Sequence, residues 1–416
     1  MLQKKGLLIA VLLLAVSPAL AQTESKPVFG ITLSGFVKTD MIYDSRQTVS
    51  IREGHYLLFP KNELPDKEGR DLNAASSFHM LSLQTRLLGR ITAPDAFGAK
   101  TSGLIEAEFF GTSDADINGF RLRHAYVKLD WTKTEMMIGQ FWHPMFVTES
   151  FPEVVSFNTG APFQPFNRAP QVRLTRVFGR WSLAAAAMAQ RDFASMGPDG
   201  VSTVYARNGL VPEFNLKLQY AARDEKSGSE LLLGLGGDVL TLRPRTVSTN
   251  GYAADETMTS TAGMAFLRIK TKGLTFKAEA VYGGNLHHLT MAGGYAVEAV
   301  TDVERGLVAY APLHTATGWT ELMTNGKSFQ VGIFAGYSKN LGAEGEISGP
   351  AYARGGDIDS LARVSPRLVF NSGKVRLAAE CEWTGAWYGT PRADGTVGEI
   401  KLVSNVRLLG AVYLFF

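Results

Sequence analysis

The last eighteen residues of the chain, 399–416, most constrain what it can fold into, because apolar residues occupy nearly every second position there. The even positions from Ile400 to Phe416 are mostly apolar, whereas the odd positions include Lys401 and Arg407. A period of two indicates a β-strand with one apolar and one polar face. The strand is longer than most globular strands, which favours the wall of a transmembrane barrel. The alternative is an edge strand of a soluble β-sandwich.

The N-terminus indicates that the protein is exported. Lys4 and Lys5 precede a short apolar run that ends in the small-residue site Ala19-Leu20-Ala21. A basic start, a short apolar stretch and such a site are typical of a secretory signal peptide, so we expect residues 1–21 to be removed. Residues 22–416 are then expected to form a single outer-membrane β-barrel domain, without a membrane-spanning helix.

Charge and cysteine content exclude several classes of protein. Of the 42 basic residues, Lys4 and Lys5 belong to the signal peptide, which leaves 40 against 39 acidic residues and a net charge of +1. A nearly neutral chain is not expected to bind nucleic acid. Cys381 is the only cysteine, so the exported fold must be stable without an internal disulfide. Its strand face is otherwise apolar, and we expect Cys381 to face lipid.

The same alternation recurs along the chain and predicts an all-β, antiparallel transmembrane barrel of sixteen strands, with fourteen and eighteen as alternatives. The expected strands cover residues 29–44, 77–92, 101–110, 118–131, 135–142, 169–178, 181–190, 211–222, 229–242, 258–271, 273–285, 314–323, 327–337, 358–370, 374–387 and 399–416. The long connections follow odd-numbered strands, as in barrels with short periplasmic turns and long external loops. Arg121 and Arg123 interrupt the alternation of the fourth strand, which predicts a β-bulge or an extension above the bilayer.

Two long connections are expected to take different positions. Residues 45–76 are charged and rich in turn residues, so we expect an external loop. Residues 143–168, after the fifth strand, are rich in proline and aromatic residues and carry Glu149, Glu153 and Arg168. We expect this connection to fold into the lumen as a constriction loop. The alternative is an ordinary surface loop.

Assigning faces by alternation predicts a lumen that is richer in basic than in acidic residues. The basic residues predicted to line the pore are Lys38, Arg86, Arg90, Arg173, Arg363, Arg367, Lys374, Arg376, Lys401 and Arg407. Glu106 and Glu108 are expected to face the basic residues of the last three strands across the pore. Confined Arg and Lys side chains raise the local concentration of anions, and guanidinium groups bind carboxylates bidentately. Alternatively, these charges pair with one another and only keep the lumen hydrated.

Five short segments together resemble the DcaP-like outer-membrane porins. They are FRLRHAYVKL (120–129), GQFW (139–142), GFVKTD (35–40), APQVRLT (169–175) and GYSKNLG (336–342). The resemblance implies a sixteen-stranded, trimeric channel of the Gram-negative outer membrane that passes small solutes, often anions such as dicarboxylates. Residues 45–76 and 286–313 depart from the family pattern, which puts the choice of solute in doubt.

The histidines form neither a metal-binding nor a catalytic motif. His287 and His288 adjoin each other on a predicted loop, a weak indication of a metal, and we expect them to be solvated. No nucleophilic serine motif or phosphate-binding loop is present, so we predict no catalytic residue, no metal, no cofactor and no enzymatic activity.

The expected function is a passive diffusion channel for small hydrophilic solutes with a mild preference for anions. Its expected partners are outer-membrane lipid, small anionic or polar solutes and two further copies of the chain. The alternative is a non-conducting barrel that acts as an adhesin or structural protein.

Overall fold

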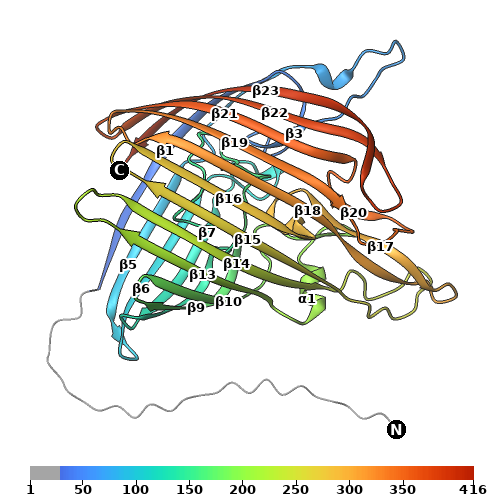
Figure 1. Cartoon of the computed structure of the whole chain (residues 1–416), viewed down its shortest axis with the longest axis horizontal. Helices are drawn as coiled ribbons and strands as arrows, with labels where there is room; N and C mark the ends of the chain where they lie inside the picture. The colour runs from blue at the N-terminus through green and yellow to red at the C-terminus, as the bar shows by residue number, and fades with distance from the viewer. Residues whose placement is uncertain (1–28) are drawn as a thin grey trace, which may run out of the picture.

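The computed structural model describes residues 29–416, which form one closed antiparallel β-barrel (Figure 1). The predicted signal peptide, residues 1–21, lies outside the described residues. The barrel has sixteen wall strands, as the alternation predicts. Short turns and the end of the last strand lie at one end of the barrel, and the long connections lie at the other end.

The wall strands follow one another around the barrel in chain order. They are β1 (Gly30–Asp44), β5 (Arg86–Ala96), β6 (Ala99–Glu108), β7 (Arg121–Asp130), β8 (Thr134–Trp142), β9 (Arg168–Phe178), β10 (Trp181–Met188), β13 (Glu213–Arg223), β14 (Glu230–Leu242), β15 (Met258–Lys270), β16 (Leu274–Gly284), β18 (Leu307–Thr324), β19 (Phe329–Gly342), β21 (Ile358–Ser372), β22 (Val375–Pro391) and β23 (Val397–Phe415). Strand β4 (Ser77–Leu81) continues the line of β5, because both pair with β1. All sixteen predicted strands overlap these segments.

The remaining elements belong to the long connections. They are β2 (Thr48–Ile51), β3 (Tyr56–Pro60), η1 (Leu72–Ala74), η2 (Asp114–Asp116), β11 (Met196–Gly197), β12 (Gly200–Val201), α1 (Val204–Gly209), η3 (Leu286–Leu289), β17 (Gly293–Asp302) and β20 (Ala351–Arg354). Strand β17 pairs with the outer part of β18 and with β20, so the wall extends on this side beyond the ring. Within residues 29–416, no helix has the length and apolar character to cross a membrane.

The ring closes where the first strand meets the last. Strands β1 and β23 pair antiparallel from Phe36 with Phe415 to Asp44 with Arg407. Strand β6 pairs Glu106 with His124 but Ala107 with Leu122, so Arg123 is the extra residue of a bulge in β7. Of the two predictions for the interrupted alternation of this strand, a β-bulge or an extension above the bilayer, the structure confirms the bulge.

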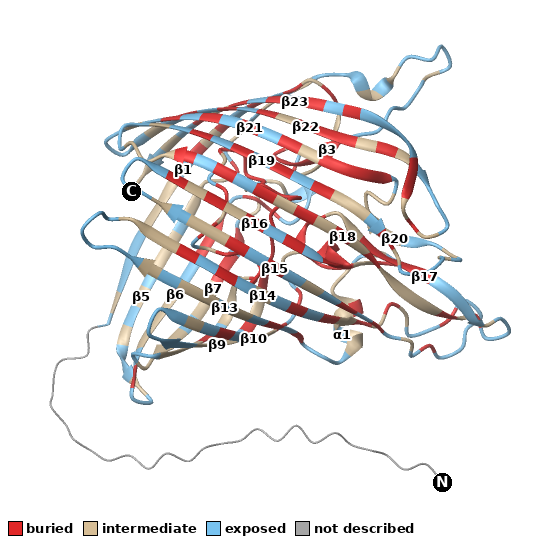
Figure 2. Cartoon of the chain, viewed as in Figure 1, coloured by how far each residue is buried: buried red, intermediate tan, exposed pale blue. Residues whose placement is uncertain are grey.

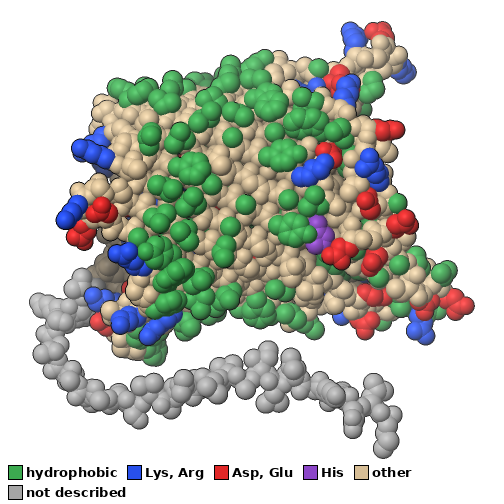
Figure 3. All heavy atoms as spheres, in the orientation of Figure 1, with side chains coloured by type: hydrophobic (Ala, Val, Ile, Leu, Met, Phe, Trp, Pro, Cys, Tyr) green, Lys and Arg blue, Asp and Glu red, His purple; other side chains and the backbone are tan. Residues whose placement is uncertain are grey.

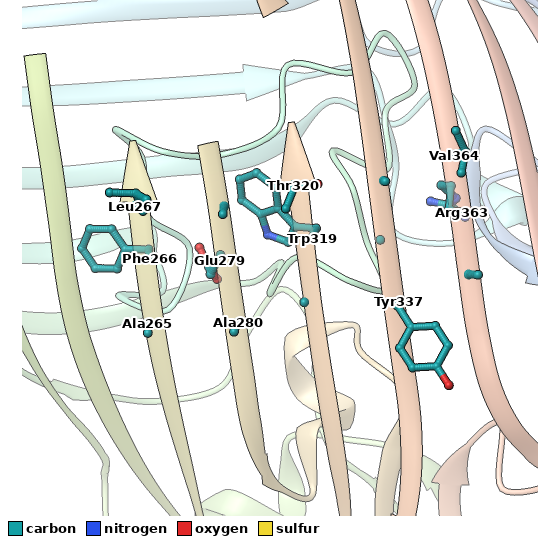
Figure 4. A pocket seen from close by; sticks show the side chains of 15 residues that line it. Ala265, Phe266, Leu267, Glu279, Ala280, Trp319, Thr320, Tyr337, Arg363 and Val364 are labelled. Carbon is teal, nitrogen blue, oxygen red and sulfur yellow. The ribbon is translucent and has the colours of Figure 1, made fainter. Parts of the chain in front are cut away.

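Buried and exposed residues alternate along the wall strands (Figure 2), because one face of each strand meets the filled interior. The outer wall carries mainly apolar side chains, and charged side chains gather toward the two ends of the barrel (Figure 3). Figure 4 shows the alternation over β15 to β21: Phe266, Trp319 and Arg363 are buried, whereas Tyr337 and Val364 are exposed on the outer wall. An apolar outer face and a polar inner face suit a barrel that spans a membrane.

Two expectations about the connections are wrong. Residues 45–76 do not form an external loop throughout, because the β2–β3 hairpin is folded into the barrel, where Tyr56, Leu58 and Phe59 join its buried aromatic cluster. Strand β18 begins at Leu307 rather than near residue 314, because its outer part pairs with β17. Both features depend on partners far away in the sequence, which alternation alone does not identify.

Candidate functional site

The inward loop, residues 143–167, connects β8 to β9 and is largely buried inside the barrel, where charged wall residues bind its backbone. Lys38 Nζ donates to the carbonyl of Val155 at 3.0 Å, and Lys277 Nζ donates to the carbonyl of Phe151 at 3.0 Å. The carboxylate of Glu321 accepts from the backbone N–H of Glu153 at 2.8 Å. Buried backbone groups need such partners, so the polar lumen wall and the inward loop require each other.

The β2–β3 hairpin is held in the lumen in the same way. Arg407 Nη2 donates to the carbonyl of Gly54 at 2.6 Å, and Arg363 Nη2 donates to that of Leu58 at 2.7 Å. Arg363 also donates from Nη1 to the carbonyl of Ala161 at 2.6 Å. One guanidinium therefore joins the hairpin, the inward loop and the wall.

Aromatic side chains from these inward segments and the wall form a layer across the lumen. The layer consists of Tyr56, Phe110, Phe157, Phe166 and Phe193. The rings of Phe110 and Phe157 stack with centroids 4.0 Å apart, and Tyr56 meets Phe166 edge-on at 5.3 Å. A run of proline and aromatic residues buries its apolar surface here, which explains why it folds inward rather than into water.

A cavity lies on each side of the aromatic layer. The cavity toward the long connections has a volume of about 770 Å³ and is lined by residues such as Arg52, Asp192 and Arg354. The cavity toward the short turns has a volume of about 410 Å³. The lining residues of the two cavities do not overlap.

The cavity toward the short turns is the candidate solute site. Its charged lining consists of four arginines and two glutamates: Arg86, Arg123, Arg367, Arg376, Glu106 and Glu153. Aromatic rings complete it, among them Trp142, Tyr413 and Phe415. A cavity with a basic excess and aromatic walls suits a small anion, because guanidinium groups bind carboxylates and aromatic faces cover apolar carbons.

Glu153 is the acidic residue that the inward loop contributes to this cavity. It lies 2.7 Å from Lys277 Nζ. Burial opposes ionisation of Glu153, but the attraction of Lys277 outweighs it and holds the pKa of Glu153 below its usual value. Glu153 is therefore an anion at neutral pH and attaches the loop to β16.

Several predicted pore-lining bases are ion-paired or hydrogen-bonded inside the lumen. Lys38 lies 3.0 Å from Asp40, Arg407 lies 2.7 Å from Asp44, and Arg367 lies 2.6 Å from Glu321. Arg363 lies 3.4 Å from Glu382. For these four residues the structure favours the alternative in which lumen charges satisfy one another and the inward loops.

Glu106 lines the same cavity as Arg367 and Arg376 of the last strands, but Glu106 and Glu108 form their ion pairs with arginines of the neighbouring strands. Glu108 lies 3.1 Å from Arg86 and 2.8 Å from Arg121, and both carboxylates lie 2.5 Å from Arg123. Arg121 and Arg123 were not predicted to line the lumen, because the bulge shifts the alternation of β7.

The other predicted residues occupy more varied positions. Arg173 is half-buried and donates to the carbonyl of Trp142, and Arg376 donates to Asn371 beside the rings of Tyr413 and Phe415. Arg90 is exposed on β5, and Lys374 is exposed in the turn between β21 and β22. Lys401 is exposed near the long connections and pairs with Glu63 at 2.6 Å. Lys374 and Lys401 therefore do not contribute to the cavity.

The other two residues predicted for the constriction loop, Glu149 and Arg168, have separate positions and partners. Glu149 is exposed, and its carbonyl accepts from Arg268 at 2.8 Å. Arg168 is the first residue of β9 and lies 2.6 Å from Asp192. Burial opposes ionisation of Asp192, but Arg168 and Arg121 hold its pKa below the usual value.

The fold and its apolar wall define the class of this protein: a sixteen-stranded antiparallel β-barrel with the fold of outer-membrane channels. No protein-family model matches the chain, and no curated protein matches it. Three solved structures have a fold similar to that of this chain. The outer-membrane channel DcaP of Acinetobacter baumannii is 17% identical, with a TM-score of 0.69 and coverage of 95% of this chain and 100% of that one. The trimer form of OmpT, an outer membrane protein of Vibrio cholerae, is 9% identical, with a TM-score of 0.53 and coverage of 93% and 99%. An anion-selective porin from Comamonas acidovorans is 12% identical, with a TM-score of 0.51 and coverage of 93% and 100%. At these identities the likeness is one of fold.

Proposed function

We propose that the protein is a porin, a passive diffusion channel for small hydrophilic solutes with a mild preference for anions such as dicarboxylates. The observation that carries this proposal is the cavity of four arginines and two glutamates below the inward loop. Confined basic groups favour anion entry, and paired guanidinium groups suit a solute with two carboxylates. The channel names of DcaP and of the Comamonas acidovorans porin agree with it.

We further propose that residues 22–416 are the mature domain and that three copies assemble into a trimer. The trimer form of Vibrio cholerae OmpT, which shares the fold, supports this arrangement. Crosslinking of the detergent-extracted protein, followed by electrophoresis, should give a ladder that ends at three chains. A ladder that ends at one chain would contradict the trimer and leave the channel proposal unaffected.

A planar bilayer experiment tests the channel. We expect stepwise conductance from the refolded protein and an anion-selective reversal potential under a salt gradient. Arg376→Gln should reduce the anion preference, because Arg376 lines the cavity. Lys374→Gln is the matched control, since Lys374 lies at the same end of the barrel in an exposed turn. Cation selectivity of the wild type, or equal effects of the two variants, would contradict the assigned anion site.

One observation favours the second candidate, a non-conducting barrel that acts as an adhesin or structural protein. The aromatic layer separates two cavities that share no lining residue. Folded, heat-modifiable protein that inserts into the bilayer without any conductance would favour this candidate over the porin.

A further inference from the structure

Four metal-ligating side chains meet in the barrel interior, away from the arginine-lined cavity. They are His143, at the start of the inward loop, Glu213 on β13, Asp238 on β14 and His288 in η3. None of the four residues is more than 4% exposed. Four segments that are separated in the sequence therefore place imidazole and carboxylate groups at one buried point.

The ligand atoms of this cluster lie close enough together to bind one metal ion. Nε2 of His143 and Nε2 of His288 lie 3.0 and 2.7 Å from the same oxygen, Oε1 of Glu213. Nε2 of His143 lies 3.7 Å from Oδ1 of Asp238. One donor atom from each of the four side chains lies within 4.8 Å of all the others. Ligand atoms around a tetrahedral metal ion, each about 2.0–2.2 Å from it, are separated by about 3.3–3.6 Å.

The charges and hydrogen bonds of the cluster are incomplete without a cation. Two carboxylates are buried there, and neither has a lysine or arginine within 4.0 Å in the part of the chain that the structure describes. Oε2 of Glu213 is buried and has no hydrogen-bond partner among residues 29–416. A buried carboxylate oxygen without a partner is costly, and a divalent cation would satisfy both its charge and its lone pair.

We propose that His143, Glu213, Asp238 and His288 form a binding site for one divalent transition-metal ion, with zinc as the best match. Two imidazole nitrogens and two carboxylate oxygens are ligands that zinc accepts in tetrahedral sites, and two carboxylates with two neutral imidazoles balance the charge of the ion. The site goes beyond the proposed channel function, because it does not face the arginine-lined cavity and shares no residue with its lining.

The hydrogen bonds around the four ligands show which tautomers must change when a metal ion binds. Asn215 Nδ2 donates to Oδ1 of Asp238 at 3.1 Å and orients that carboxylate. The backbone N–H of Met145 donates to Nδ1 of His143 at 3.2 Å, so Nε2 carries the proton when no metal is bound. Zinc takes Nε2, and the hydrogen bond from Met145 is then lost as the proton moves to Nδ1. Nδ1 of His288 has no partner in the described chain, so that ring can change tautomer freely.

Bound zinc would fix the inward loop and η3 to two strands of the barrel wall. His143 begins the inward loop, and His288 belongs to η3, whose Leu289 carbonyl accepts from the backbone N–H of Phe166 at 2.7 Å. Glu213 and Asp238 lie on neighbouring wall strands. The metal site therefore joins the inward loop and η3 to the barrel wall.

Metal retention by the full-length refolded protein tests the proposal. The protein is refolded in detergent with zinc sulfate, passed through a desalting column and measured for zinc by mass spectrometry. We expect about one zinc per wild-type chain, and little in His288→Gln and Asp238→Asn. His314→Gln is the matched control, because His314 stacks on Tyr282 outside the cluster, and it should retain zinc like the wild type. Wild-type protein that retains no more zinc than the His288→Gln variant would overturn the proposal.

A second measurement on the wild type covers the case in which the ligand variants do not fold. The protein is refolded with cobalt(II) chloride in place of zinc. Cobalt in a four-coordinate site of two histidines and two carboxylates gives strong visible absorption, whereas hydrated six-coordinate cobalt is pale. Strong bands that disappear when zinc is added support the site. Bands no stronger than those of free cobalt overturn it.

Discussion

Arg363→Met should release the two inward segments from the wall without unfolding the barrel. Arg363 is only 1% exposed. It donates to the carbonyls of Leu58 and Ala161 and to Thr384 Oγ1, and it lies 3.4 Å from Glu382. Methionine fills a similar volume but supplies none of these hydrogen bonds and leaves the Glu382 carboxylate without its cation.

The size of the effect follows from these contacts. A hydrogen bond from a charged group contributes about 1.5–3 kcal/mol, and removal of one partner of a buried ion pair destabilises by about 3–5 kcal/mol. The two estimates describe overlapping interactions, so we expect a total of about 3–5 kcal/mol. The loss falls on the attachment of the hairpin and the inward loop, because the antiparallel ladder of β21 with β19 and β22 is formed by backbone groups.

Native-state hydrogen exchange followed by mass spectrometry measures this attachment. Since each 1.4 kcal/mol corresponds to a factor of ten, amides of residues 52–60 and 155–163 should exchange about 100-fold to several thousand-fold faster in Arg363→Met. Wall amides should keep their wild-type rates. Lys374→Met, in the exposed turn after β21, is the control and should change neither segment. Unchanged rates in both segments of Arg363→Met would refute the assignment of Arg363 as their common anchor.

Three further predictions concern single side chains. The lowered pKa of Glu153 means that its attraction to Lys277 is fully present above the usual glutamate value of 4.5 and is lost as the pH falls through the lowered value. The anion preference that we propose for the channel should therefore increase in acid. Glu153→Gln should show that increase already at pH 7, measured as a reversal potential. Lys401→Met removes an exposed pair with Glu63 and should change the free energy of unfolding in urea by less than about 1 kcal/mol; a larger loss would contradict the peripheral position of this pair. Cys381 is exposed on the outer wall, so a lipid-soluble maleimide should label it in membranes while a charged maleimide should not, and equal labelling by both would contradict its lipid-facing position.

The wall of this barrel could be predicted because its determinants are local. Each strand carries its own alternation of apolar and polar residues, and a shift by one residue would turn the apolar set toward water. All sixteen predicted segments overlap wall strands, from β1 to β23. The outer part of β18 was missed, because it forms by pairing with β17, which in turn pairs with β20, rather than from a pattern of its own.

The contents of the lumen could be predicted only in part. The apolar and proline-rich composition of residues 143–168 predicts that they fold inward, because water would not solvate so many aromatic rings. The β2–β3 hairpin is surrounded by charged and turn residues in the sequence, which conceal its buried apolar run, Tyr56 to Phe59. The histidine cluster was also missed, and His287 and His288 are buried rather than solvated as expected. Its ligands come from positions 143, 213, 238 and 288, and only the closed barrel brings them together.

The number of basic residues that point into a barrel is therefore a poor measure of its selectivity. A guanidinium such as that of Arg363, which donates to Leu58, Ala161 and Thr384, has its hydrogen-bonding groups committed to the protein. Arg376 differs, because its Nε donates to Asn371 and its plane lies beside the rings of Tyr413 and Phe415. Within residues 29–416 its other N–H groups have no hydrogen-bond acceptor. A guanidinium that is held by aromatic faces but keeps free donors can bind a passing carboxylate without losing its position, and for this reason Arg376, rather than the more numerous committed bases, should control which solutes pass.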